Sequence, residues 1–169
     1  MSLAEDLLAQ AKHLAELERR RPKQASLRRA ISTAYYSMFH LLVDEATMLV
    51  VPTAALRAAA ARSFDHKALK NAAKLVGGAY RGQANWLGAY MRGSISDELA
   101  GVCDAFVELQ DQRLTADYDT SVSFTRAQVS SRVGATVWTH AEWRHERRSY
   151  NARVFLLASA GLLRSRDGR

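Results

Sequence analysis

The chain has 169 residues, of which 48% are hydrophobic, and a single cysteine, Cys103. This is enough for one domain over residues 1–169, and one cysteine excludes an internal disulfide framework or a zinc site built on a cysteine pair. Lysine and arginine outnumber the acids by 24 to 17, a net charge of +7, and 19 of the 24 are arginine. Such a chain suits RNA or a nucleotide, although a GC-rich genome gives the same composition.

The chain begins with an acidic stretch that has no signal-peptide pattern. Its longest apolar runs, Val102 to Leu109 and Val154 to Leu163, are too short or too interrupted to cross a membrane. With a single cysteine, a reducing compartment fits best. We therefore expect a cytoplasmic protein that has no membrane segment.

Apolar residues at helical spacing predict a first helix over residues 3–20. Arg19-Arg20-Arg21 and Pro22 are expected to end it, because cations suit the negative end of the helix dipole; phosphate binding by these arginines is the alternative. A second helix is predicted from about Lys23 to Val50, before Pro52.

Two shorter helices follow in the middle of the chain. Thr53 is expected to cap one through about Ala61, and Ser63 or Asp65 to cap another that ends at Gly77-Gly78. Residues 79–93 contain glycines among aromatic residues, which predicts a connector pinned by its aromatic side chains, either ordered but irregular or partly helical. The next helix is predicted from Ser94 or Ser96 to about Ala116.

The last third of the chain returns to helix after a break. Residues 121–124 alternate and favour an extended strap, and Arg126 then opens one long helix, or two that break near Gly134. No strand or repeat is needed. The sequence therefore predicts an all-α fold, an up-and-down helical bundle of about five main helices.

The second helix carries one polar stripe. Residues three and four apart share a helix face, which aligns Arg29, Thr33, Tyr36, His40 and Asp44. This stripe is either a functional site or the hydrogen-bonded half of a bundle core, and the second interpretation is favoured.

Three blocks of sequence resemble the HEPN superfamily, small helical bundles of prokaryotic toxin–antitoxin, defence and nucleotidyltransferase-linked systems. The first block reads Arg-x-x-x-x-Ala-Tyr-Tyr-x-x-Phe-His from Arg29 to His40. The second is His66-Lys67, and the third runs from Arg113 to Asp119. The resemblance implies a helical bundle that often forms a homodimer, with active members acting as metal-independent endoribonucleases.

The catalytic signature that the resemblance implies is an arginine followed by a histidine after four to six intervening residues, and this chain lacks it. At the corresponding place Arg113 is followed by Asp117 and Asp119. A carboxyl group with an ordinary pKa of about 4 is a poor proton donor at neutral pH. We expect Arg113 to form an ion pair with Asp117 or Asp119 that holds the strap to the helix.

Catalysis through another arrangement is the alternative. RNA cleavage needs a base, an acid and cationic stabilisation, which His40, His66 and Arg113, together with Lys67, can supply. The resemblance suggests a shared pocket of Tyr36, His40, His66 and Arg113.

A second cluster lies in the last third, where residues 126–169 hold nine arginines and three acids. Aromatic side chains alternating with arginines can stack bases and bind phosphates. A solvated face, or one that covers a dimer partner, is the other interpretation. The members of the cluster are Trp138, Trp143, Arg144, Arg147 and Arg148.

No residue pattern calls for a metal or cofactor. The sequence therefore favours a HEPN-like protein that binds RNA, a nucleotide or a partner, without the usual ribonuclease motif. The candidate binding residues are Arg29, Tyr36, Lys67, Asp117, Asp119 and the second cluster. The competing hypotheses are a ribonuclease with a non-standard site and a module that pairs only with a protein such as a nucleotidyltransferase or an antitoxin.

Overall fold

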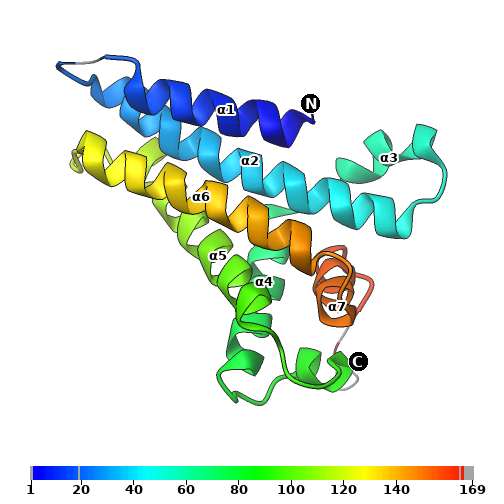
Figure 1. Cartoon of the computed structure of the whole chain (residues 1–169). Coiled ribbons are helices and arrows are strands. Elements are labelled where there is room, and N and C mark those ends of the chain that lie inside the picture. Colours follow the sequence, from blue (N-terminus) through cyan, green and yellow to red (C-terminus); the bar gives the residue numbers. More distant parts are fainter. Residues whose placement is uncertain (1, 19, 164, 166–169) are drawn as a thin grey trace. The chain divides into compact units, whose positions relative to one another are not determined.

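The computed structural model describes residues 2–18, 20–163 and 165. Arg19 of the predicted arginine run lies outside them, as do residues 164 and 166–169 of the basic segment. The described part of the chain is all-helical and contains no strand, as predicted, with seven α-helices where about five main ones were expected (Figure 1). The elements are α1 Leu3–Glu16, α2 Gln24–Val50, α3 Ala54–Ala61, α4 His66–Tyr80, the 3₁₀ helix η1 Trp86–Tyr90, α5 Asp97–Tyr118, α6 Arg126–Glu146 and α7 Tyr150–Ser159.

The contacts within the chain divide it into two units. Unit 1 comprises residues 1–41 and 108–141, and unit 2 comprises residues 42–107 and 142–169. Helices α2, α5 and α6 each contribute residues to both units.

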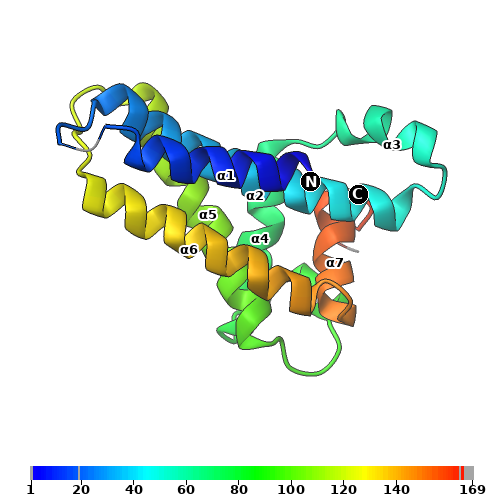
Figure 2. The ribbon, with the colours of Figure 1, turned by 45° about the horizontal axis from the view of Figure 1, so that its top comes forward.

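In unit 1, α1 runs antiparallel to the first part of α2 (Figures 1 and 2). Ser2 and Glu5 form a capping box at its start. The helix ends at Glu16, four residues earlier than predicted, because Glu18 turns to the start of α2. There its carboxylate accepts hydrogen bonds from the Lys23 amide, at 3.2 Å, and the Ser26 hydroxyl, at 2.8 Å.

The core of unit 1 forms where α2 meets α5 and α6. Three apolar residues of α2 at helical spacing, Ile31, Ala34 and Met38, are fully buried there. The largest enclosed side chain of this unit is Tyr35, whose ring contacts those of Tyr36 and Phe39.

In unit 2, α4 packs on α7 and contacts η1. Asp65 caps α4 by accepting from the Lys67 and Ala68 amides, as one of the two predicted caps. The predicted end of this helix at Gly77-Gly78 is wrong. Both glycines are buried within α4, and the chain leaves the helix at Gly82, which has a φ of 77°.

The connector of unit 2 is ordered and partly helical, as predicted. Trp86 and Tyr90 meet edge to face in η1, but hydrogen bonds also fix the loop. The Asn151 side chain of α7 accepts from the Arg92 amide and donates to the Arg92 and Ser94 carbonyls. Asparagine thus does much of the positioning that the aromatic residues were expected to do.

Of the two alternatives for the last third, one long helix or two that break near Gly134, neither is found as stated: α6 continues through Gly134, and a second helix, α7, follows later. Gly134 is exposed, so glycine costs this helix only about 1 kcal/mol relative to alanine. The break falls instead at residues 147–149. Ser149 accepts from the Ala152 amide and so begins α7.

Candidate functional site

Arg113 is the centre of a polar cluster in unit 1. Its side chain is 15% exposed, and Nε lies 2.8 Å from Oδ2 of Asp117, an ion pair without hydrogen-bond alignment. Nη2 donates to the Tyr36 hydroxyl at 2.9 Å. The guanidinium carbon lies 5.3 to 5.9 Å from the ring centroids of Tyr35, Tyr36 and Tyr118, within cation–π range. The predicted pairing with an aspartate is therefore present.

The surroundings of Arg113 favour its charged form. Burial acts against the charge, but Tyr36 and Asp117 outweigh it and raise the pKa of Arg113 above its ordinary value. The second oxygen of Asp117 accepts from the Ser32 hydroxyl. Arg113 and Asp117 thus pair with each other and bind Tyr36 and Ser32 on α2. These contacts give the cluster a structural role, since they connect α5 to α2.

The Arg113–Asp117 pair does not hold the strap, because both residues belong to α5. Arg28, which was not among the predicted site residues, holds the strap instead. Its guanidinium donates to the carbonyls of Ala116, Asp119 and Val122, at 2.8 Å and 3.0 Å for the first two. The neighbouring Arg29 is exposed, so it contributes positive charge at the surface.

Asp119 acts within its own turn. Its carboxylate accepts from the Ser121 hydroxyl and amide, and these hydrogen bonds lower its pKa. On the other side of the strap, the Gln24 amide group exchanges hydrogen bonds with the backbone of Phe124, at 2.7 and 2.9 Å. The strap is therefore fixed to the start of α2 through its backbone.

His40 and His140, both in unit 1, have different environments. The ring of His40 is partly exposed and meets Phe39 edge to face, at 5.6 Å between centroids. His140 is buried, and its Nε2 lies 2.7 Å from the Ser37 hydroxyl. The histidine that is buried and hydrogen-bonded in this unit is thus His140, which was not among the predicted site residues. Nothing in the local sequence links it to Ser37, because 103 residues separate them.

The four residues of the predicted pocket are divided between the two units. Unit 1 joins Tyr36 to Arg113 directly and also holds His40. His66 and Lys67 form the first turn of α4 in unit 2, where His66 is partly buried and Lys67 is exposed. A pocket shared by all four residues stays a prediction.

The two tryptophans of the second cluster differ in exposure. Trp138 is 51% exposed and belongs to unit 1, so its ring is accessible. Trp143 is fully buried in unit 2, against Phe155 at 6.1 Å between ring centroids. Base stacking on Trp143 is therefore ruled out in this structure, and its ring is a core element.

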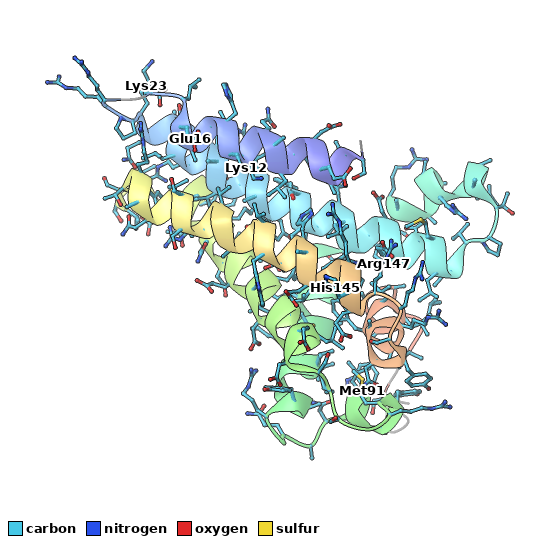
Figure 3. The ribbon with its side chains drawn as sticks, in the orientation of Figure 1. Lys12, Glu16, Lys23, Met91, His145 and Arg147 are labelled. Atoms are coloured by element: carbon cyan, nitrogen blue, oxygen red, sulfur yellow. The ribbon has the colours of Figure 1, made fainter. Side chains whose placement is uncertain are left out.

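The arginines of this cluster lie at the end of α6 and the turn that follows. Arg144 and Arg148 are exposed, whereas Arg147 points toward the last turns of α2 and forms an ion pair with Glu45 at 3.0 Å (Figure 3). A cavity of about 300 Å³ opens beside them within unit 2. Its polar lining comprises Arg147, Arg148, Arg153 and Glu45, and its apolar lining comprises Met48, Leu49 and Leu156. Arg153 was not among the predicted site residues.

Cys103 does not offer an exposed nucleophile. It is fully buried, and burial raises its pKa far above the ordinary value, so the thiol stays protonated at neutral pH. Across the described ranges, no group of three or more histidine, cysteine or acidic side chains could hold a metal ion. In the same part of the chain, no helix is both long and apolar enough to cross a membrane.

Comparisons with known proteins give no match. No protein-family model, no curated protein and no solved structure matches the chain.

Proposed function

We propose that this chain is a HEPN-like protein that associates with RNA or a nucleotide through arginines, without using the usual HEPN ribonuclease motif. The observation that carries the proposal is the pair Arg148 and Arg153 beside the cavity of unit 2. Neither guanidinium has a hydrogen bond or ion pair within residues 2–18, 20–163 and 165. An arginine without an acidic partner is available for a phosphate.

The charge of the whole chain supports the same proposal. A net charge of +7 draws a polyanion toward the protein from a distance, and unpaired arginines then supply short contacts. Arg144 and Arg29 add exposed positive charge in units 2 and 1 respectively. The toxin–antitoxin or defence setting, a homodimer and a nucleotidyltransferase or antitoxin partner rest on the sequence resemblance alone.

A ribonuclease that uses His40, His66 and Arg113 is the competing hypothesis. Such an enzyme needs a cation that can reach the reacting phosphate. Arg113 is already engaged by Asp117 and Tyr36, and a phosphate would have to displace at least one of them. The proposed function therefore leaves catalysis out.

One experiment separates association from cleavage. Purified protein and a His40→Ala/Arg113→Ala variant are incubated with total cellular RNA in chelator, and both cleavage and retention on a filter are read. We expect retention that weakens as salt rises, with no cleavage, for both proteins. Metal-free cleavage by the wild type that the variant lacks would establish the enzyme instead. Neither cleavage nor retention would point to a module that pairs only with a protein.

A further inference from the structure

We propose that the cavity beside Arg148 and Arg153 binds a nucleotide phosphomonoester, which is either the phosphorylated end of an RNA strand or a free mononucleotide. This inference rests on the proposed function and narrows it to one ligand chemistry at one site. The cavity lies in unit 2, between the last turns of α2, the turn that follows α6, and α7.

The side chains around the cavity give it a positive charge. Three guanidinium groups line it, and Glu45 neutralises only that of Arg147. Arg148 and Arg153 remain uncompensated among the described residues. Two helix dipoles act on the cavity with opposite sign, a negative one from the C-terminal end of α2 and a positive one from the N-terminal half of α7. The side-chain charges therefore decide the sign of the electrostatic potential in the cavity.

Two unpaired arginines match a terminal phosphate better than an internal one. A phosphomonoester carries a charge of about −1.5 to −2 at pH 7 and offers three acceptor oxygens. A phosphodiester within a strand carries a single charge. Because each guanidinium can donate two parallel hydrogen bonds, Arg148 and Arg153 together can occupy all three oxygens of a terminal phosphate.

The size and the apolar wall of the cavity suit the rest of a single nucleotide. About 300 Å³ is at the lower end of the range for small-ligand pockets. Met48 and Leu49 are 47% and 38% exposed although they are apolar, whereas Leu156, which also lines the cavity, is buried. A sugar or base that covers Met48 and Leu49 would remove apolar surface from water.

Two larger cavities of unit 2 lack this charge. One, of about 520 Å³, is lined by Lys74 with amide side chains and Trp86. The other, of about 560 Å³, is lined by Tyr80 and the acidic Asp97. A single lysine or an acid is a poorer partner for a dianion than two arginines, so the charge selects the smaller cavity.

The test compares two short single-stranded RNAs of one sequence, one with a 5′-phosphate and one with a 5′-hydroxyl, by fluorescence anisotropy at fixed salt. The pocket variant is Arg148→Gln/Arg153→Gln. The matched control is Arg20→Gln/Arg62→Gln, which removes the same charge from two exposed arginines outside the cavity. Adenosine monophosphate and adenosine serve as competitors.

We expect the wild type and the control variant to bind the phosphorylated RNA about tenfold more tightly than the hydroxyl form. The pocket variant should bind both forms equally, and adenosine monophosphate should compete where adenosine does not. Tight but equal binding of both RNAs by the wild type would overturn the inference and leave the proposed function standing. A phosphate preference that survives in the pocket variant would also overturn it.

Failure to bind either RNA would instead count against the RNA part of the proposed function. Direct titration with adenosine monophosphate then decides between the two sources of the phosphate. Binding that the pocket variant loses would support the cavity as a site for a free nucleotide. No binding of adenosine monophosphate would overturn the inference together with the proposed function.

Discussion

Arg113 and Tyr36 lie 77 residues apart in the sequence, and the guanidinium of the first donates a hydrogen bond of 2.9 Å to the phenol oxygen of the second. This bond joins α5 to α2 within unit 1. Arg113 stands where the resemblance places the arginine of a catalytic motif, but its partner four residues later is Asp117, not a histidine. We therefore interpret the cluster of Arg113, Asp117 and Tyr36 as a clamp, a set of contacts that holds α5 to α2.

Replacement of Tyr36 by phenylalanine tests the clamp. The variant keeps the ring near Arg113 and removes only the hydroxyl, so we expect a loss of about 1 kcal/mol in the free energy of unfolding by urea. Tyr118→Phe is the matched control, because the Tyr118 ring also lies near Arg113 but is 72% exposed. Equal stability losses in both variants would contradict the assignment.

Arg28 should be the residue that fixes the strap. Arg28→Met removes a charged donor from three backbone carbonyls, and we expect a loss of about 2 kcal/mol with faster amide hydrogen exchange over residues 119–125. Arg29→Met removes the same charge from the exposed neighbouring position and should leave exchange there unchanged. Unaltered exchange in the Arg28 variant would show that Gln24 alone holds the strap.

The two tryptophans of the second cluster should differ in their accessibility to a fluorescence quencher and in their contribution to stability. Because the chain has three tryptophans, each ring is measured in a variant that keeps it alone: acrylamide should quench Trp138 strongly in Trp86→Phe/Trp143→Phe and Trp143 weakly in Trp86→Phe/Trp138→Phe. Trp143→Ala should cost about 3–5 kcal/mol in the free energy of unfolding, because it empties a core position. Trp138→Ala should cost less than about 1 kcal/mol. Strong quenching of Trp143 in the folded protein would contradict its burial.

Cys103 predicts a pH dependence of stability. Burial raises its pKa, so above the unfolded thiol value of about 8.5 the folded state keeps a proton that the unfolded state releases. Stability from this group is therefore complete below that pH and falls as pH rises, by up to about 1.4 kcal/mol per pH unit.

The difference between wild type and Cys103→Ala isolates this effect from other groups that titrate in the same range. The stability of the wild type relative to the variant should decrease between pH 8 and 10. A difference that stays constant over that range would mean that the thiol is accessible to water.

Local sequence signals predict the start and end of most helices because their causes are local. Pro22 and Pro52 bracket α2, and Asp65 supplies the N-terminal acceptor of α4. Glycine was the least reliable signal for the end of a helix. Gly134 is tolerated inside α6, and Gly77 is buried in α4 beside the Arg81–Asp104 ion pair, which lies across the space that a Cβ would occupy.

The partners within the candidate sites depend on tertiary packing and could not be predicted in full. The helix spacing places Arg113 beside Asp117, and that pair was expected. The contacts of Arg28 with the strap and of His140 with Ser37 join distant segments, for which a single sequence carries no signal. Arg153 could not be predicted as a site residue, because only the folded unit 2 brings it to the cavity that residues of α2 also line.

The salt dependence of RNA binding tests the central claim most directly. A labelled single-stranded RNA is titrated with the wild type and with Arg148→Gln/Arg153→Gln over a series of salt concentrations. For an RNA with a 5′-phosphate, we predict that log K falls linearly with log salt, and that the variant slope is shallower by about 0.7, since the two arginines contact one terminal phosphate. Absence of binding at low salt, or binding that does not change with salt, would contradict the account.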